Sequence, residues 1–507
     1  MRAAFAVVFA LLALAATPRA QGLVTCQSGV ADEDGNPGTS FNNFPCGSVD
    51  LYAHLPHGTF GTFYGNDIWG WTDPDSGREF ALVGLLDGTA FVEVTDPVNP
   101  VYLGKLPTAT ESSFWRDIKT YGHYAFVVSE ASEHGMQVFD LTRLLDVASP
   151  PVTFEADAHF TGPDDAPLGS AHNIAIDTES GFAYAVGSGE CEGGLYIVDI
   201  RDPLNPTQAG CFGEDGYTHD TQCVVYRGPD PDYQGRQVCV SSNEDTLTLT
   251  DVTDKANPVL ISRGFYPNPA YTHQGWFTED QRYFLVDDEL DEITGLTSNT
   301  RTIVFDLTDL DDPEFDFFYF SELPSSDHNL YIRGHYAYLS NYTTGLRILD
   351  LSGIDDDLVT EVAYFDTYWD TDASGTMGQW SNYPFFPSGT VVANDTDYGL
   401  FVLRPNLPTT AAEPEAPGDA GFALSAPVPN PFRSRITLRL SVARTQAVTA
   451  EVLDVAGRRV AVLHDGPVAA GAPLTLILDA TALPAGLYLV RVVGEDFTAT
   501  RRAALVH

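Results

Sequence analysis

The segment Gly194-Leu-Tyr-Ile-Val-Asp199 indicates how the chain folds, because the same six-residue pattern returns along the sequence. Each copy has a central run of strand-forming residues, and in six of the seven copies the last residue is acidic. The copies end at Glu93, Asp140, Asp199, Asp251, Asp306, Asp350 and Arg404, at spacings of 44 to 59 residues. A period near 50 residues is typical of a repeat architecture.

Each repeat contains four segments that predict strands. An entry segment begins with a polar pair, and an apolar segment such as 124–128 follows it. The six-residue pattern comes third, and an outer segment such as 101–104 follows a proline turn. Four strands per unit, seven times over, predict an all-β chain with a seven-bladed β-propeller; an open β-solenoid is less favoured, because its repeats are shorter.

The seventh repeat lacks its fourth strand before residue 406. The segment 49–56, near the start of the chain, resembles that missing strand. We expect it to pair with the last repeat and close the ring, which leaves no free sheet edge.

The two ends of the chain differ in composition from the repeats. Residues 1–20 read as a secretory signal peptide, with cleavage after Ala20 favoured over cleavage after Ala15. Residues 21–46 form a lead-in, 47–406 the propeller, and 407–421 a linker rich in proline, alanine and glutamate. Residues 422–507 alternate polar and apolar residues between turns, which predicts a small Ig-like β-sandwich. After the leader, no stretch has the length of a membrane span.

Cysteine usage agrees with export to an oxidising compartment. Six cysteines permit fifteen pairings, and we expect nearest neighbours to pair. A thiolate metal site is disfavoured, since no C-x-x-C spacing occurs. The expected disulfides are Cys26–Cys46, Cys191–Cys211 and Cys223–Cys239.

The charge of the chain excludes some partners. It has 70 acidic and 26 basic residues, a formal net charge of −44. Nucleic acids and anionic membranes reward clusters of lysine and arginine, so neither is an expected partner. No nucleophile elbow, Walker motif or dinucleotide-binding glycine motif supports a familiar catalytic class.

The polar pairs of the entry segments line up from repeat to repeat. Four consecutive repeats place histidine first, and the second member is always Asp, Asn or Gln. In a propeller the entry strand lines the central channel, so one member of each pair should face the axis near one mouth. The funnel-lining candidates are Asp67, Arg116, Asp117, Asn173, Asp220, Gln274 and Asn329, beside His172, His219, His273 and His328.

Loops that open on the same face carry carboxylates, among them Glu130, Glu244 and Glu289. Imidazole with carboxylate suits a transition metal, and carboxylate alone suits calcium. Three interpretations stay open: a divalent metal held by the histidines and these glutamates, a metal-free ligand site, and hydrogen bonding between blades. The third is favoured, because a residue repeated at a repeated position is more often structural.

Three ordered motifs near the C-terminus, Pro429-Asn430-Pro431-Phe432, residues 454–460 (DVAGRRV) and residues 483–491 (LPAGLYLVR), resemble the C-terminal sorting domain of the type IX secretion system. The resemblance implies the secretion machinery as a partner, passage across the outer membrane, and removal of the tail. The protein would then be attached to the cell surface or released.

The repeats resemble the LVIVD-type repeat, and the span 47–405 resembles the choice-of-anchor B family. The stretches that carry this resemblance are 67–71, 112–118, 129–140, 217–220 and 271–276. The family implies a fold and a surface location but no activity. We therefore predict an extracellular scaffold that binds an unknown ligand or protein. The alternatives are a metal-dependent hydrolase or oxidoreductase and a structural protein of the cell envelope.

Overall fold

The structure is a computed structural model that describes residues 23–27, 29–32 and 43–407 and much of the C-terminal part: 422–425, 427, 435–454, 458–470, 474–480, 483–484, 486–495 and 497–505. The predicted signal peptide, nearly all of the linker and the Pro429–Phe432 motif lie outside these residues. The chain divides into two units, Met1–Asn406 and Leu407–His507, and each is described by itself.

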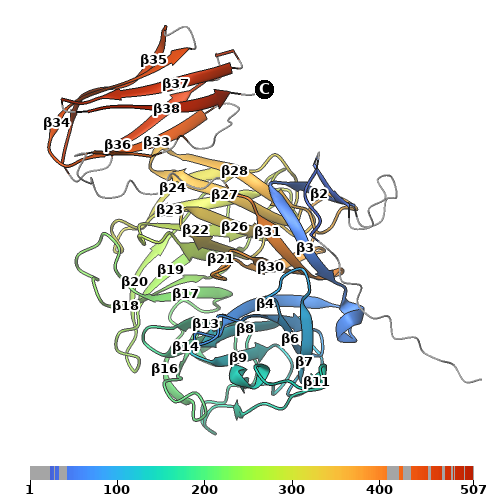
Figure 1. Cartoon of the computed structure of the whole chain (residues 1–507). Coiled ribbons are helices and arrows are strands. Elements are labelled where there is room, and N and C mark those ends of the chain that lie inside the picture. Colours follow the sequence, from blue (N-terminus) through green and yellow to red (C-terminus); the bar gives the residue numbers. More distant parts are fainter. Residues whose placement is uncertain are drawn as a thin grey trace, which may run out of the picture. The chain divides into compact units, whose positions relative to one another are not determined.

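The described residues of the first unit form seven sheets, each of which contains four neighbouring antiparallel strands (Figure 1). The first three sheets are β4 (Gly65–Thr72), β5 (Glu79–Leu85), β6 (Gly88–Glu93) and β7 (Val101–Pro107); β8 (Arg116–Tyr121), β9 (Tyr124–Ser129), β10 (Met136–Asp140) and β12 (Ala158–Phe160); and β13 (Asn173–Asp177), β14 (Phe182–Val186), β15 (Leu195–Asp199) and β16 (Thr207–Phe212). A short strand, β11 (Val152–Thr153), adds to the first sheet through β7.

The next four sheets have the same arrangement, and the last takes its fourth strand from the start of the unit. They are β17 (Asp220–Val225), β18 (Gln237–Ser242), β19 (Leu247–Asp251) and β20 (Val259–Gly264); β21 (Thr272–Phe277), β22 (Tyr283–Asp288), β23 (Arg301–Asp306) and β24 (Glu314–Phe320); β25 (Leu330–Arg333), β26 (Tyr336–Ser340), β27 (Leu346–Gly353) and β28 (Leu358–Phe365); and β29 (Gln379–Tyr383), β30 (Val391–Asp395), β31 (Gly399–Pro405) and β3 (Val49–Leu55).

The first strands of the sheets form a closed ring. β4, β8, β13, β17, β21, β25 and β29 each contact the next one, and β29 contacts β4. The six-residue pattern of each repeat lies in the third strand of its sheet, as the sequence predicted. The prediction of an all-β chain built as a β-propeller is therefore confirmed.

The ring closes where the sequence placed the closure. β3 pairs antiparallel with β31, from Val49 opposite Pro405 to Leu55 opposite Leu400. Strands from the two ends of the unit thus share one sheet, and unfolding either end opens the ring.

The lead-in adds two strands that the sequence did not suggest. β2 (Asn43–Gly47) pairs with β28, and β1 (Val30–Asp32) pairs with β2. Phe44 of β2 is fully buried, and its ring contacts those of Phe365 and Phe401. The lead-in thereby covers the edge of the sixth sheet.

Apolar side chains fill the space between neighbouring sheets. One cluster joins Phe80 and Phe91 of the first sheet to Phe139 of the second, and the rings of Phe91 and Phe139 stack 4.6 Å apart. The strands read as nearly continuous apolar runs because both faces of each sheet are covered.

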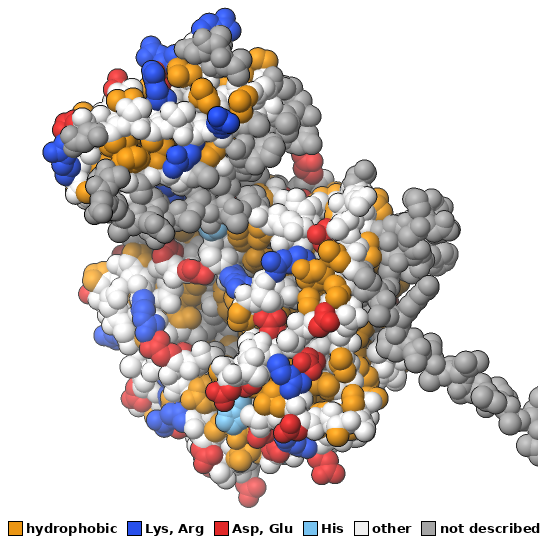
Figure 2. Space-filling model, viewed as in Figure 1, with side chains coloured by type: hydrophobic (Ala, Val, Ile, Leu, Met, Phe, Trp, Pro, Cys, Tyr) orange, Lys and Arg blue, Asp and Glu red, His pale blue; other side chains and the backbone are white. Residues whose placement is uncertain are grey.

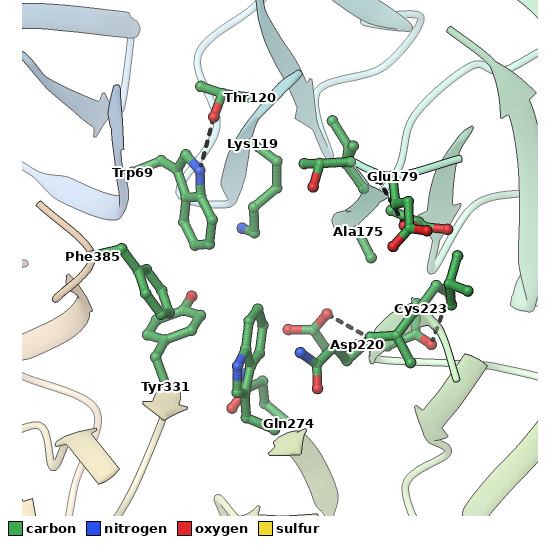
Figure 3. A pocket seen from close by; sticks show the side chains of 18 of the residues that line it. Trp69, Lys119, Thr120, Ala175, Glu179, Asp220, Cys223, Gln274, Tyr331 and Phe385 are labelled. Carbon is green, nitrogen blue, oxygen red and sulfur yellow. Dashed lines mark hydrogen bonds between the residues drawn. The ribbon is translucent and has the colours of Figure 1, made fainter. Parts of the chain in front are cut away.

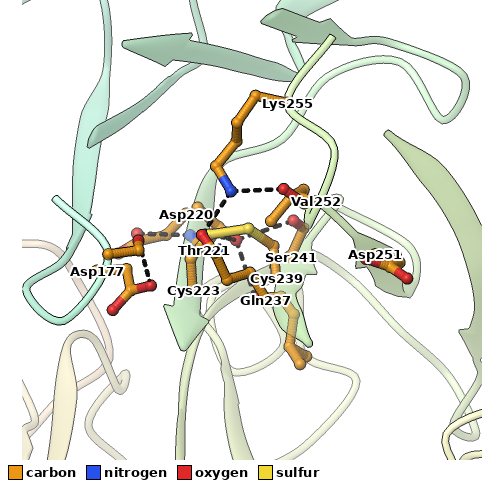
Figure 4. Close-up of a disulfide and its surroundings, with 12 residues drawn as sticks. Asp177, Asp220, Thr221, Cys223, Gln237, Cys239, Ser241, Asp251, Val252 and Lys255 are labelled. Atoms are coloured by element: carbon orange, nitrogen blue, oxygen red, sulfur yellow. Dashed lines mark hydrogen bonds between the residues drawn. A yellow bond between two sulfur atoms is a disulfide. The ribbon is translucent and has the colours of Figure 1, made fainter. Parts of the chain in front are cut away.

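All three expected disulfides are present: Cys26–Cys46, Cys191–Cys211 and Cys223–Cys239. Cys223 and Cys239 lie directly opposite each other on β17 and β18 (Figure 4). Close by, the Lys255 ammonium donates hydrogen bonds to the Gln237 side chain and to the Val252 carbonyl.

The second unit is a β-sandwich. One sheet contains β32 (Phe422–Leu424), β33 (Arg435–Val442) and β36 (Leu474–Asp479), and the other contains β34 (Gln446–Asp454), β35 (Arg459–Val468), β37 (Gly486–Val493) and β38 (Thr498–Leu505). Side chains from both sheets form one apolar core, which includes Leu438 and Val490.

Charge is divided unequally between the two units. Residues 407–507 contain nine basic and nine acidic residues, so the net charge of −44 belongs to residues 1–406. Figure 2 shows the lysine and arginine side chains of the sandwich, and the acidic side chains scattered over the propeller. The acidic character is thus a property of the propeller.

Candidate functional site

The second members of the entry pairs connect neighbouring sheets. Oδ2 of Asp67 accepts a hydrogen bond from the backbone N–H of Ile118 at 3.0 Å, and Oδ2 of Asp117 accepts one from Ile174 at 2.7 Å. Oε1 of Gln274 accepts the N–H of Leu330 at 2.9 Å. Each of these hydrogen bonds joins one sheet to the next, which is the kind of contact that the structural interpretation of the pairs expects.

The other second members of the entry pairs do not share one pattern of hydrogen bonds. Nδ2 of Asn173 donates to the carbonyl of His219 at 3.1 Å, which again joins two sheets. Asp220 accepts only from the backbone N–H of Thr221, among the described residues. Oδ1 of Asn329 is buried without a partner in the same part of the chain.

Arg116 stands where four other repeats have histidine. Its guanidinium is buried, and it donates to the Leu85 carbonyl at 3.2 Å and to Nε2 of His134 at 3.1 Å. Burial and the nearby guanidinium lower the pKa of His134 to about 4. Arg116 thus replaces the histidine of its repeat with a fixed positive charge.

The four histidines form an arc at the start of four neighbouring inner strands. The ring centroids of His172 and His219 are 4.3 Å apart, those of His219 and His273 are 4.1 Å apart, and those of His273 and His328 are 4.4 Å apart. His219, His273 and His328 are buried. The structure therefore brings together all four imidazoles that the sequence singled out.

Three of these imidazoles are held through Nδ1. Nδ1 of His219 donates to the His273 carbonyl at 3.0 Å, and Nδ1 of His328 donates to the Trp380 carbonyl at 2.5 Å. Nδ1 of His273 lies 2.8 Å from Oδ1 of Asp287. Because a carbonyl can only accept, His219 and His328 carry their proton on Nδ1 and keep a lone pair on Nε2. Oδ1 of Asp287 also accepts the backbone N–H of Gln274, so it acts as an acceptor, and His273 takes the same tautomer.

Glu289 lies between two of these lone pairs. Its Oε2 is 3.9 Å from Nε2 of His273, and its Oε1 is 4.0 Å from Nε2 of His328. The Tyr342 hydroxyl donates to Oε1 of Glu289 at 2.6 Å and fixes this carboxylate. Ligand atoms about 2 Å from a tetrahedral zinc ion stand about 3.3 Å apart, so these groups would move together by about 0.6 Å to share an ion.

Burial keeps these imidazoles neutral. Desolvation, followed by the neighbouring imidazoles, lowers the pKa of His219 and of His273 well below the usual value. Desolvation also lowers the pKa of His328 to about 3 and raises the pKa of Glu289. Neutral imidazole is the form that binds a metal ion.

The remaining predicted ligands stand apart from this group. His172 pairs with Glu130, whose Oε1 lies 2.6 Å from its Nδ1. Glu244 is exposed. The ligand atoms that lie within 4.8 Å of one another belong to His273, Glu289 and His328.

Sequence reasoning missed two residues of this group. Tyr342 lies between β26 and β27, on the face where the glutamate-bearing loops open, but an aromatic residue in a loop gives no distinctive signal. Asp287 was visible as part of an acidic run, and only the fold shows that its carboxylate faces His273.

Farther along the same inner strands lies a cavity of about 450 Å³ (Figure 3). Trp69, Tyr331 and Phe385 line one side, and Asp220, Glu179 and Cys223 line the other. Trp276 and Tyr383 complete the aromatic side: the rings of Trp276 and Tyr331 are 5.1 Å apart, and those of Trp69 and Tyr383 are also 5.1 Å apart. Inner strand β13 contributes the small side chain of Ala175 to the cavity wall.

A buried charge cluster adjoins the cavity, and Lys119 and Asp220 of this cluster line it. Nζ of Lys119 lies 2.5 Å from Oδ1 of Asp117 and 3.6 Å from Oδ2 of Asp67, and it lies over the Trp69 ring at 4.6 Å. Desolvation and the Asp117 charge raise the pKa of Asp220 to about 7. Burial likewise raises the pKa of Asp67 well above its usual value, so Asp117 is the carboxylate that balances the charge of Lys119.

The comparisons with known proteins agree with the two-unit organisation. Residues 428–505 match the secretion system C-terminal sorting domain, and residues 169–212 match the LVIVD repeat. No curated protein matches the chain. No helix among the described residues has the length and apolar character needed to cross a membrane.

Several solved structures are distantly similar. PorZ of Porphyromonas gingivalis, described as an essential surface component of the type-IX secretion system, gives a TM-score of 0.43 at 13% identity over 88% of this chain. The chain spans 59% of the length of PorZ. A protein from Lactobacillus plantarum gives 0.42 at 13% identity, over 82% of this chain and all of that one. A functionally unknown protein from Desulfotomaculum acetoxidans gives 0.41 at 13% identity, over 62% and 89%.

The sorting motifs predicted at the C-terminus are confirmed by the match to the tail, and the repeat pattern by the match within the third sheet and its flanks. The chain is an LVIVD-repeat protein with a β-propeller fold and a type IX sorting domain, which directs it to the cell surface or the extracellular space.

Proposed function

We propose that this exported propeller binds a transition-metal ion through Nε2 of His273, Nε2 of His328 and the carboxylate of Glu289, and binds an extracellular ligand in the cavity farther along its inner strands. The observation that carries the proposal is the anchoring of both imidazoles through Nδ1, which leaves two lone pairs beside one carboxylate. Metal-bound histidines in proteins are oriented by such outer hydrogen bonds.

The donor set favours a transition metal over calcium. Two nitrogens and one oxygen suit zinc, copper, iron or manganese, whereas calcium takes oxygen ligands. Asp287 would act as the outer carboxylate that orients His273, and Tyr342 would orient Glu289 in the same way. His219 is the nearest further imidazole, with its ring 4.1 Å from that of His273.

A binding role is supported by the cavity that adjoins the charge cluster. Its aromatic and acidic walls come from the channel-lining strands, and 450 Å³ is the size of a small-molecule site. Because the propeller carries all of the net negative charge, cationic or metal-associated ligands are the expected class. The choice-of-anchor B resemblance of the repeats is consistent with this role, and we propose membership of that family.

One observation favours a second candidate, a metal-dependent hydrolase or oxidoreductase. Two histidines and one glutamate leave coordination positions for water or substrate, which is the pattern of catalytic zinc sites. Glu130 and His172 form a pair at the same mouth, where they could accept a proton from bound water. Turnover that requires both the metal and Glu130 would establish this alternative.

Zinc binding measured by equilibrium dialysis tests the proposal. We expect the wild-type chain to bind one Zn²⁺. His273→Ala and His328→Ala should each lower the zinc affinity by more than the about 10–100-fold that loss of an outer-shell group costs. The matched control is His123→Ala, an exposed histidine in the turn between β8 and β9. Binding that persists in both site variants, or that falls equally in the control, would refute the metal site.

A further inference from the structure

A second group of acidic residues lies fully inside the propeller. Asp291 and Glu292 belong to the segment between β22 and β23, and Asp327 precedes β25. Their exposed fractions are 0%, 6% and 0%. One carboxylate oxygen from each lies within 4.8 Å of the others.

Most oxygens of this group lack a hydrogen-bond donor. Among the described residues, neither oxygen of Asp327, neither oxygen of Glu292, nor Oδ1 of Asp291 has a partner. Oδ2 of Asp291 alone is paired, with Nε of Arg301 at 2.7 Å. Buried polar atoms are nearly always paired in proteins, so five unpaired oxygens at one place point to a missing ligand.

The surrounding charge does not compensate for these carboxylates. Arg301 forms an ion pair with Asp291 and is shared with Asp288 at 3.3 Å. Among the described residues, Glu292 and Asp327 have no ion pair with a basic group. Burying unpaired charges of one sign is strongly destabilising unless a cation is present.

We infer that Asp291, Glu292 and Asp327 bind a calcium ion. An all-oxygen, carboxylate-rich site suits calcium, which accepts six to eight oxygens at about 2.3–2.6 Å in flexible geometry. Oxygens on opposite sides of such an ion are about 5 Å apart, and one oxygen of each residue lies within 4.8 Å of the others, so all three residues can reach one ion. Extracellular calcium sites have dissociation constants of about 0.1–1 mM, which suits an exported protein.

Calcium at this place would join two segments that carry the transition-metal ligands. Glu289 lies two residues before Asp291 on one segment, and His328 directly follows Asp327 on the other. The ion would therefore fix the relative position of Glu289 and His328. This role is independent of whether a transition metal binds, since the calcium ligands are separate residues.

The test uses the full chain, stripped with EGTA and titrated with CaCl₂. We expect the stripped chain to bind about one Ca²⁺ with a dissociation constant of about 1 mM or below. Its melting temperature should rise with the CaCl₂ concentration and then reach a plateau. MgCl₂ at the same concentration should raise the melting temperature less, because magnesium is smaller and requires nearly ideal octahedral coordination. Absence of any calcium-dependent shift in the wild-type protein would overturn the inference and leave protons as the compensation for these carboxylates.

Conservative variants locate the ion. Asp327→Asn and Glu292→Gln should abolish the bound Ca²⁺ and the calcium-dependent shift, while in EGTA they should melt near the wild-type temperature, because each amide replaces a buried carboxyl group that lacks a hydrogen-bond donor. The matched control is Asp309→Asn, in a partly exposed acidic group with Asp230 and Asp311. Calcium binding lost in the control but kept in Asp327→Asn would place the ion elsewhere and refute the assignment.

Discussion

His273 and Asp287 form a fully buried pair, with Nδ1 of the imidazole 2.8 Å from Oδ1 of the carboxylate and side-chain exposures of 1% and 0%. The same Oδ1 accepts the backbone N–H of Gln274 at 2.9 Å. Asp287 therefore fixes both the orientation of the imidazole and the start of the inner strand. In the proposed metal site, this pair directs Nε2 of His273 toward Glu289.

Asp287→Asn should weaken zinc binding while the fold is kept. The amide oxygen still accepts a hydrogen bond, but its lack of charge makes the imidazole a poorer donor to metal. We expect a loss of about 10–100-fold in affinity, the usual effect of an outer-shell change. Competition with a zinc-binding dye would measure it, and unchanged affinity would show that Asp287 has only a structural role.

Gln274→Ala should destabilise the propeller more than His328→Ala. Removing the Gln274 side chain leaves the Leu330 N–H without its acceptor between two sheets, a cost of about 1–3 kcal/mol. Truncating His328 removes one hydrogen-bond donor from the Trp380 carbonyl, which lies at a mouth of the channel. Urea unfolding of the two variants would compare them. The reverse order would mean that the histidine arc, rather than the second members, holds the ring together.

The stability contributed by Asp220 should depend on pH. Its pKa is raised to about 7 in the folded protein, from 3.8 in the unfolded chain, so the unfolded state loses its proton first. The contribution is full below about pH 4 and falls as the pH rises to about 7. Asp220→Asn should therefore melt about 2–4 °C above wild type at pH 8 and at nearly the same temperature at pH 4. An equal difference at both pH values would contradict this assignment.

Removal of the Cys223–Cys239 disulfide by a double substitution to alanine should cost about 2–5 kcal/mol of unfolding free energy. The bridge constrains the unfolded chain over 16 residues and lies at the wall of the cavity. Thermal unfolding of this variant beside the Cys26–Cys46 double variant would measure the effect. A propeller as stable as wild type after removal would show that strand pairing alone suffices there.

Deletion of the residues after Asn406 should keep the protein in the periplasm, because the sorting domain is the part that the type IX machinery recognises. Cell fractionation with surface protease treatment would locate the truncated chain. Display of that chain on the cell surface would contradict the role of the tail.

The repeats could be predicted from the sequence because each carries the same local pattern. The run from Leu195 to Asp199 has strand propensity and a turn on each side, and its spacing from the other copies defines the sheets. Closure by β3 and the three disulfides followed from the same regularity and from proximity in sequence. β1 and β2 could not be predicted, because their stability comes from the edge of β28 rather than from their own sequence.

The histidine arc could be predicted, but the separate roles of its members could not. Alignment of the repeats places the four imidazoles at one level, and neither propensity nor spacing reveals which Nδ1 finds a carbonyl. Tyr342 reaches Glu289 only through the fold of the loop between β26 and β27. Similarly, the pairing of His172 with Glu130 takes two expected ligands out of the metal group.

Elemental analysis of the full chain, purified without chelators, tests the metal site of His273, His328 and Glu289 with the fewest assumptions. We expect about one equivalent of a transition metal in the wild-type protein, which is absent from the double variant His273→Ala/His328→Ala and retained in His123→Ala. A wild-type protein without transition metal, which also takes up none on incubation with Zn²⁺, would contradict the metal site and leave the histidines as hydrogen-bonding groups of the ring.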